Sequence, residues 1–286
     1  MKAILRIVII LSVFLLTNQS YGQAIAERWH TCLGGTKWDE GSGIIEAGGS
    51  YWVVSLTESS NGDVSFNHGI YDIWLVNIDS VGNLISEKSV GGSNYEGGEL
   101  NIKKVNDSVF YIIGLTQSND GDISDNPWPL ASGSYWIIKI NHHGDILWEK
   151  ALGGSRIEAI QNGLVTSDGG IIAFGYTNSE DGDITRYFDD YDLWMVKLND
   201  EGEIQWDFTL GSFSGEGGGA IKQTSDGGFI VIGYTSGGEG GNFDTTCNYH
   251  GPGGYGYTDA WVVKLDSLRN IEWQQCYGGS YHEGGS

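Results

Sequence analysis

Apolar and polar residues alternate along short stretches of this chain, and one such stretch occurs four times. It reads DLWMVKLNDEGEIQWDFTLGS from Asp192 to Ser212, and related text begins at Asp72, Ser134 and Asp259. Alternation with a period of two predicts strands with one buried face, and the Asp-Glu-Gly segment between the two halves predicts a tight turn. The recurrence of one strand–turn–strand unit indicates a repeat architecture.

Each repeat contains four predicted strands and closes on a glycine motif. In the first repeat we expect strands at 43–47, 51–57, 72–79 and 83–90, and in the third at 160–166, 171–177, 192–199 and 203–210. Four antiparallel strands per unit are typical of a β-propeller blade, which is stable only when stacked on its neighbours. The sequence therefore predicts an all-β fold, a β-propeller with four complete blades at about 36–91, 92–153, 154–211 and 212–279.

The two ends of the chain do not match whole repeats. Residues 27–33 resemble the last strand of a repeat without the strands before it, so we expect an orphan N-terminal strand there. The final residues, Tyr281 to Ser286, resemble the start of a further repeat. We therefore expect a truncated ring, an open arc whose next blade is cut off after residue 286.

Composition supports an all-β protein and limits the partners. The 286 residues include 46 glycines, 11 tryptophans and 15 tyrosines but only 3 prolines, as expected for short strands joined by tight turns. The formal net charge is −22. Such a surface repels the phosphates of nucleic acids, which excludes nucleic-acid binding, and favours cations, neutral glycans or basic partners.

The N-terminal segment and the cysteines indicate where the protein is located and whether disulfides stabilise it. Residues 1–22 combine Lys2 and Arg6 with an apolar run and small residues at a cleavage position, which predicts a signal peptide. We expect residues 23–286 to be secreted or at the cell surface, with no membrane span. Cys32 and Cys276 occupy equivalent places in different repeats and Cys247 lies in a loop. Equivalent sites in different blades lie too far apart to bridge, so no disulfide framework is expected.

The repeat resembles a known family. Its pattern is LGGS-x-x-E, then TSDGG, then GYT-x-S-x-DGD, then D-x-W-x-VKL, then G-x-I-x-W, over residues 27–286. This is similar to the SBBP-like β-propeller repeats of secreted and surface proteins from Bacteroidetes-type bacteria, many exported by the type IX system. The resemblance implies a propeller fold and an extracellular location, and it leaves the ligand open.

One face of such a propeller is expected to carry any function. Strand direction places the loop between the second and third strands on the same face as the connections between blades. These loops span 58–71, 117–133, 178–191 and 236–258 and hold most of the irregular sequence. Binding residues are usually carried on such loops.

An acid recurs a few residues after each closing glycine motif. The set is Asp39, Glu96, Glu158, Glu216 and Glu283. One interpretation is a ring of carboxylates near the mouth of the central channel that concentrates cations. The other is that each carboxylate accepts hydrogen bonds from amides of its own blade connection. Repetition in every blade favours the structural interpretation, because a ligand site usually breaks the symmetry.

Acidic residues also open the long loops around a glycine. They are Asp63, Asp120, Asp122, Asp181 and Asp183. Closely spaced carboxylates are ligands that Ca²⁺ accepts, so calcium is a possible cofactor, and no other cofactor is expected. The spacing is not that of an EF-hand, and Asx-turns explain the same residues without a metal.

Aromatic residues fall into two groups. Tryptophans that recur in the third and fourth strands are interpreted as packing between blades. Aromatics in the long loops break the repeat and are candidates for stacking on sugar rings, although they could equally bury their own loops. The candidate ligand-binding residues are Trp128, Tyr187, Phe188, Tyr249, Tyr255 and Tyr257, with Phe66 as a further loop aromatic.

Catalytic motifs are lacking in the sequence, and no catalytic residue is assigned. We therefore expect an exported, non-catalytic β-propeller that acts as a cell-surface or extracellular binding or adhesion module, with a glycan or protein as its partner. One alternative is a glycan hydrolase or lyase domain with carboxylates at the channel mouth. The other is a structural spacer in a large adhesin.

Overall fold

The structure is a computed structural model, and it describes residues 29–129, 133–237, 241–242 and 258–279. The described chain forms sixteen strands in four antiparallel sheets and no helix. The first sheet contains β1 (Asp39–Ala47), β2 (Ser50–Thr57), β3 (Asp72–Ile78) and β4 (Leu84–Val90). The second contains β5 (Glu96–Asn106), β6 (Val109–Thr116), β7 (Ser134–Asn141) and β8 (Ile146–Leu152).

The other two sheets repeat this order. The third contains β9 (Glu158–Val165), β10 (Ile171–Thr177), β11 (Asp192–Leu198) and β12 (Ile204–Leu210). The fourth contains β13 (Glu216–Gln223), β14 (Phe229–Thr235), β15 (Asp259–Leu265) and β16 (Ile271–Tyr277). In every sheet the strands are hydrogen-bonded in chain order, as in a propeller blade.

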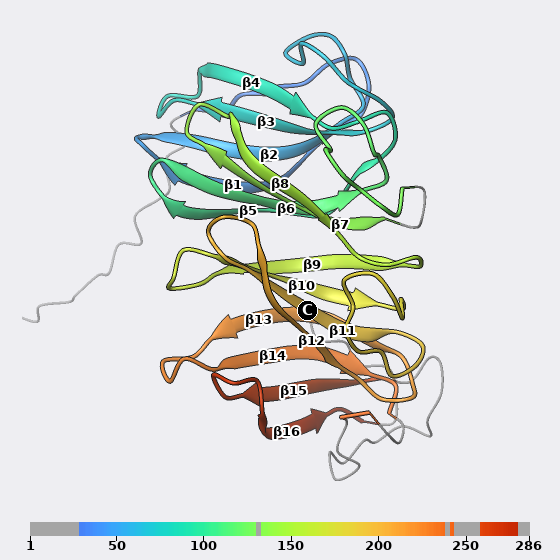
Figure 1. The fold of residues 1–286 in the computed structure, drawn as a ribbon. Coiled ribbons are helices and arrows are strands. Elements are labelled where there is room, and N and C mark those ends of the chain that lie inside the picture. The colour runs from blue at the N-terminus through green and yellow to red at the C-terminus, as the bar shows by residue number, and fades with distance from the viewer. Residues whose placement is uncertain (1–28, 130–132, 238–240, 243–257, 280–286) are drawn as a thin grey trace, which may run out of the picture.

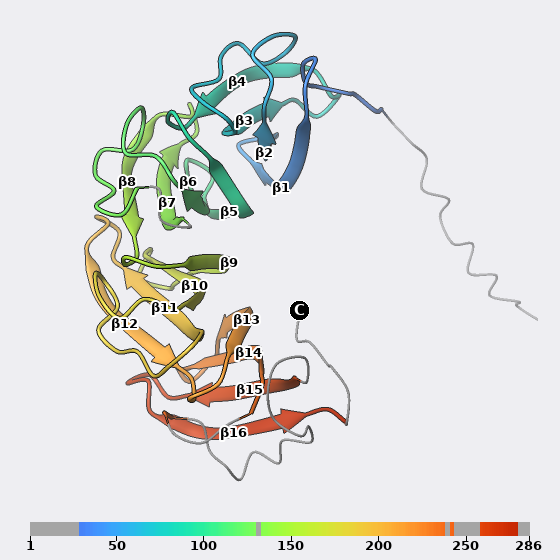
Figure 2. The same cartoon turned by 90° about the vertical axis from the view of Figure 1, so that its right-hand side faces the viewer.

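The four blades stand next to one another in an open arc (Figures 1 and 2). The first strand of each blade, β1, β5, β9 or β13, lies on the concave side, and the fourth strand lies on the convex side (Figure 2). The predicted all-β fold with four complete four-stranded blades is confirmed, and the chain has a propeller-like architecture.

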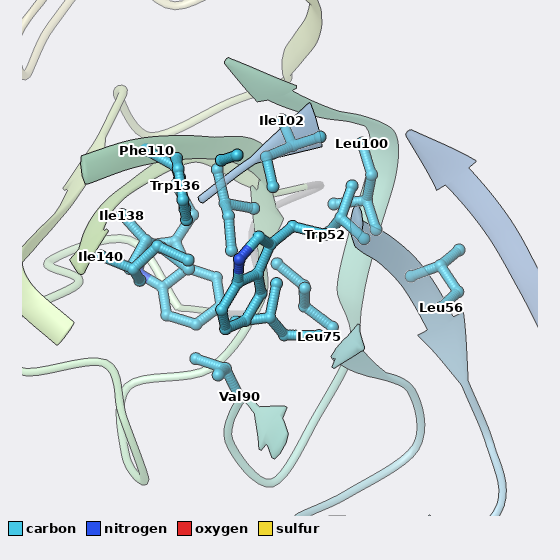
Figure 3. Close-up of a cluster of buried hydrophobic side chains, with 14 of the residues drawn as sticks. Trp52, Leu56, Leu75, Val90, Leu100, Ile102, Phe110, Trp136, Ile138 and Ile140 are labelled. Atoms are coloured by element: carbon cyan, nitrogen blue, oxygen red, sulfur yellow. The ribbon is translucent and has the colours of Figure 1, made fainter. Parts of the chain in front are cut away.

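Apolar side chains between blades hold the arc together. Trp52 of the first blade and Trp136 of the second are almost fully buried in one cluster, which is shown in Figure 3. The rings of Trp52 and Phe110 lie 5.7 Å apart across the same contact. Equivalent clusters join the second blade to the third and the third to the fourth. Because each sheet is too thin to bury its own side chains, this stacking supplies the core.

The prediction of an orphan N-terminal strand is wrong for residues 29–33, which are the part of that strand that the structure describes. Residues 29–33 form no strand, although they occupy part of the place expected for one. The indole N–H of Trp29 donates to the Ser80 carbonyl at 3.0 Å, and its ring covers Gly82 in the β3–β4 turn. Trp148 of β8 covers Gly202 in the next blade in the same way. The side-chain contact is therefore kept without the backbone ladder of a strand.

The first strand of a blade begins earlier than predicted. The strand predicted at 43–47 extends back to Asp39, and the strand predicted at 160–166 begins at Glu158. Gly41 and Gly43 flank a β-bulge in β1. Because glycine adds no side chain to either face of a sheet, a glycine-rich strand shows no alternation of apolar and polar residues, and its start was not recognised in the sequence.

The cysteine prediction needs a correction. Cys276 takes part in a disulfide bond, whereas Cys32 is free and exposed. The partner of Cys276 lies outside the described residues. The two equivalent positions, Cys32 and Cys276, are not bridged to each other, as expected for sites in different blades. In the described part of the chain no helix is long and apolar enough to traverse a bilayer.

Candidate functional site

The acidic loop motifs fasten each blade connection to the following blade. The Asp122 carboxylate accepts a hydrogen bond from the Gly91 N–H at 3.1 Å, and the Asp122 N–H donates to the Gly91 carbonyl at 2.9 Å. We call this two-way contact the connection clasp. It recurs between Asp63 and Gly34, between Asp183 and Gly153, and, with an amide in place of the carboxylate, between Asn242 and Gly211.

The other acids of these loops also bind backbone amides. Asp120 accepts from the Ser93 N–H at 2.8 Å, and Asp181 accepts from the Ser155 N–H at 2.8 Å. These are the contacts that an Asx-type structural role requires. Within the described ranges, no three His, Cys, Asp or Glu residues are grouped so that they could hold a metal ion.

The recurring acid at the start of each blade is buried against its own connection. Glu96 accepts from the Gly92 N–H at 2.8 Å and from the Thr116 hydroxyl at 2.9 Å. Glu158 accepts from the Gly154 N–H at 3.1 Å and the Thr177 hydroxyl at 2.8 Å. Asp39 and Glu216 make equivalent contacts, and Glu283 lies outside the described residues. The hydrogen bonds of these four carboxylates fix the turns of the blade connections, and Glu96, Glu158 and Glu216 are buried.

A second carboxylate stands beside this acid at two blade interfaces. In the fourth blade a Cβ added to Gly211 would lie 1.6 Å from Asp192 Oδ1 and 3.1 Å from Glu216 Oε2, so both carboxylates crowd one glycine. Burial raises the pKa of Asp192 to about 7, and the nearby Asp189 carboxylate adds to the rise. Burial likewise raises the pKa of Glu216 to about 8. The Asp192 Oδ1 atom is buried and has no hydrogen-bond partner.

The equivalent pair in the first two blades is Asp72 and Glu96, and it has a different neighbour. His68 Nδ1 lies 2.6 Å from Asp72 Oδ2, and the His68 N–H donates to the same oxygen at 2.8 Å. In the third blade Phe188 replaces this histidine and keeps only the backbone contact to Asp192, at 2.8 Å. The Asp192–Glu216 pair therefore lacks the imidazole that accompanies Asp72.

A cleft of about 470 Å³ opens between the third and fourth blades on the face that carries the long loops. We call it the interblade cleft. Tyr187 is half-buried in it, and Phe213 is 60% exposed. Its lining comes from the β10–β11 loop, the β12–β13 connection and the end of β14, and consists of Asn178, Tyr187, Asp189, Asp190, Phe213, Ser214, Gly215 and Ser236.

The repeat is broken beside the cleft by one small residue. The position just before the recurring acid holds Trp38, Tyr95 and Ile157 in the first three connections but Gly215 in the fourth. In the second connection the Tyr95 ring packs edge-on against Tyr71, at 5.7 Å between ring centroids. Gly215 places no side chain there, and among the described residues Asp190 and Ser236 approach it and line the cleft.

A second change in the repeat keeps the loop away from the connection. In the first blade Gly69 approaches so closely that a Cβ there would lie 2.4 Å from the Gly92 carbonyl oxygen. The third blade has Asp189 at this place, whose side chain could not fit that approach. Asp190, which follows, adopts a left-handed φ of 52°, and the Tyr187 hydroxyl donates to its carbonyl at 3.2 Å. Aspartate tolerates this conformation better than most residues.

The structure separates the aromatic residues singled out in the sequence. Tyr187 lines the interblade cleft, whereas Phe188 next to it stacks under Arg186 at 4.5 Å. Trp128 is half-buried in the second blade's long loop, where its N–H donates to Asn126. Phe66 packs edge-on against His68 in the first blade. Tyr249, Tyr255 and Tyr257 lie outside the described residues.

Sequence reasoning missed the connection side of the cleft. Phe213 was not singled out because it lies in a segment predicted to serve only as a blade connection. The signal was present, since the fourth connection has Phe213 where the second has Ser93, and Gly215 where the second has Tyr95. A comparison of the repeats position by position, rather than of their loops alone, would have found it.

Comparisons with known proteins leave the family open. No family model matches the chain, and no curated protein matches it. Among solved structures it is similar to a candidate glycoside hydrolase from Parabacteroides distasonis, with 11% identity, a TM-score of 0.36, and 82% of this chain and 72% of that chain covered. It is also similar to a mutant of the Synechocystis apocarotenoid oxygenase, with 11% identity, a TM-score of 0.31, and coverage of 83% and 60%.

Proposed function

We propose that the protein is an exported, non-catalytic binding module and that the interblade cleft is its glycan-binding site. The observation that carries the proposal is the cleft itself, which combines two aromatic side chains with carboxylate, amide and hydroxyl groups. Aromatic rings stack on the apolar faces of sugars, and a few placed polar groups fix the orientation of a small ligand. A volume of about 470 Å³ is within the usual range for ligand sites.

The symmetry of the repeat supports this location. Features shared by all blades, such as the connection clasp, serve the fold. The replacement of Tyr95 by Gly215 opens space that the second blade fills with its own side chain. Open space at one interface of an otherwise repeated structure is what a dedicated site requires.

A hydrolytic or lyase activity is the second candidate, because the Asp192–Glu216 pair has raised pKa values like those of catalytic acids. Both residues, however, are at most 1% exposed. A carboxylate that cannot contact a substrate cannot donate a proton to it. The raised pKa values have a structural cause in burial, which favours a binding role.

Export to the cell surface is part of the same proposal. It is supported by the charged and apolar segment at residues 1–22 and by the resemblance of the repeat to SBBP-like surface propellers. Expression of the full chain in a Gram-negative host, followed by N-terminal sequencing of the extracytoplasmic fraction, tests it. Retention of Met1 and a cytoplasmic location would contradict export.

A glycan array with purified residues 23–286 tests the binding site. We expect Phe213→Ala to abolish binding of the retained glycans without lowering the melting temperature. Phe66→Ala is the matched control, because Phe66 is 56% exposed on a long loop and does not line the cleft. Binding that is equal in wild type and Phe213→Ala, or absent across the whole array, would remove this function.

A further inference from the structure

The charged groups of the interblade cleft are unusual for a neutral-sugar site. Asp189 is exposed at the cleft, and its Oδ1 accepts a hydrogen bond from the Asp190 N–H at 2.9 Å. Asp190 and the buried Asp192 lie close enough to interact electrostatically with it and with one another. A neutral sugar packed against Asp189 would remove water from that exposed carboxylate without supplying a counter-charge, which is costly.

The cationic side chains that the structure describes near the cleft already have partners. Arg156 binds Glu180 at 2.6 Å and also donates to the Asn178 carbonyl at 3.3 Å. Arg186 lies over the Phe188 ring at 4.5 Å. Neither guanidinium lines the cleft, but Arg156 stands at its edge, where it contacts the lining residue Asn178 and acts to lower the pKa of Tyr187. Because Glu180 offsets the charge of Arg156, the carboxylates of the described lining leave the cleft with a negative potential, in a chain whose formal net charge is already −22.

The aromatic residues of the cleft suit the same kind of ligand. A cation near the face of an aromatic ring gains about 0.5–1 kcal/mol at an exposed site. Tyr187 and Phe213 come from the two sides of the cleft, one from the β10–β11 loop and one from the β12–β13 connection. Rings and a carboxylate together bind an ammonium group on a sugar ring, whose C–H face is apolar, better than they bind an anion or an N-acetyl group.

We infer that the interblade cleft selects glycans that contain amino sugars with a free ammonium group, held by Asp189 and stacked between Tyr187 and Phe213. The inference rests on the proposed glycan-binding function and deepens it. A sugar ring is favoured over a lysine side chain because a rod of four methylenes would leave much of a cleft of about 470 Å³ unfilled. Anionic glycans are excluded by charge.

Calorimetric titration with two oligomers of equal length tests the inference, one of glucosamine and one of N-acetylglucosamine. We expect the glucosamine oligomer to bind about tenfold more tightly, which corresponds to an exposed ion pair plus a cation–π contact. Higher salt should weaken its binding, whereas the binding of the acetylated oligomer should not change.

Asp189→Asn should bring the two affinities close together, because it removes the charge and keeps the shape. Asp125→Asn is the matched control, since Asp125 is an exposed carboxylate in another long loop and lies outside the cleft. Phe213→Ala should weaken both oligomers. A lysine-rich peptide should bind at least tenfold more weakly than the glucosamine oligomer.

The outcomes separate this inference from the function on which it rests. Equal affinity for the two oligomers in wild type, or selectivity unchanged in Asp189→Asn, would overturn the amino-sugar inference while glycan binding stands. Phe213-dependent binding of the lysine peptide at equal strength would overturn the choice of a sugar. No binding of either oligomer or of any arrayed glycan would overturn the proposed function as well.

Discussion

Asp183 and Gly153 hold each other by two hydrogen bonds, although they lie in different blades. The Asp183 carboxylate accepts from the Gly153 N–H at 3.0 Å, and the Asp183 N–H donates to the Gly153 carbonyl at 2.9 Å. The contact satisfies both backbone groups of a residue at which the chain leaves one sheet for the next. Its recurrence at every described blade connection explains why an acidic or amide residue follows a glycine at the start of each long loop.

The close approach of the chain at the connection clasp predicts which glycines cannot be replaced without loss of stability. A Cβ on Gly182 would lie 2.1 Å from the Gly153 carbonyl oxygen, at a φ of 72°. Gly182→Ala should therefore lower the free energy of unfolding by about 3 kcal/mol or more, measured by urea denaturation. Gly49→Ala is the control, because Gly49 has a φ of 82° with nothing within 4 Å of the added Cβ. That variant should cost about 1 kcal/mol, the backbone contribution alone. Equal losses would show that the close approach is unimportant.

The same contacts predict the response to metal removal. Asp120, Asp122, Asp181 and Asp183 point at backbone N–H groups, which carry partial positive charge and would repel a cation. We expect EDTA to leave the melting temperature unchanged, and added Ca²⁺ to raise it by less than about 1 °C. A rise that saturates with Ca²⁺ and disappears in Asp181→Asn would establish the calcium site instead.

The Asp192–Glu216 pair predicts a pH dependence with a definite sign. The pKa of Asp192 is raised from 3.8 to about 7, so between these values the folded chain keeps a proton that the unfolded chain has released. The stability that this group contributes is present below about pH 4 and is lost as pH rises through 7. Glu216, raised from 4.5 to about 8, acts in the same direction.

Asp192→Asn removes this titration and keeps an acceptor for the Phe188 N–H. Between pH 4 and pH 9 the variant should lose about 2–4 kcal/mol less stability than wild type, measured as the free energy of unfolding in urea. Asp125→Asn, which changes the same charge at an exposed site, should follow the wild-type curve. Parallel curves for wild type and Asp192→Asn would mean that Asp192 is ionised at neutral pH in the folded protein.

Arg269 is a non-glycine residue in a turn position that favours glycine, and its contact with Trp206 offers a reason why it is tolerated there. It adopts a left-handed φ of 69° where the other blades have Gly82, Gly144 and Gly202, and its guanidinium lies over the Trp206 ring at 4.7 Å. Arg269→Ala loses the ring contact and keeps the strained backbone, so it should cost about 1 kcal/mol. Arg269→Gly also loses the contact but relieves the backbone, so its net change should be near zero. A thermal melt of both variants decides, and equal destabilisation would contradict the compensation.

The architecture of the chain follows from the repeated pattern of its residues. The alternation from Asp192 to Leu198 and from Ile204 to Leu210, repeated with its glycine turns, predicts antiparallel strands wherever the pattern occurs. A sheet so thin must stack on another, so the repeat also predicts blades. These are consequences of local periodicity, which is written in consecutive residues. The strand predicted at residues 27–33 failed because the same residues can make the side-chain contact of Trp29 without the backbone ladder.

The candidate site, in contrast, depends on how the blades stack. In the sequence Tyr187 comes before β11 and Phe213 comes after β12. Only the stacking of the third blade on the fourth brings both residues to one cleft. The same stacking crowds Asp192 and Glu216 beside Gly211 and raises their pKa values by burial. The glycine at position 215 could be recognised as part of a cleft only from the structure, which shows that Tyr95 fills the equivalent place in the second connection. Periodicity specifies the blades, but the space between two blades depends on every side chain that meets there.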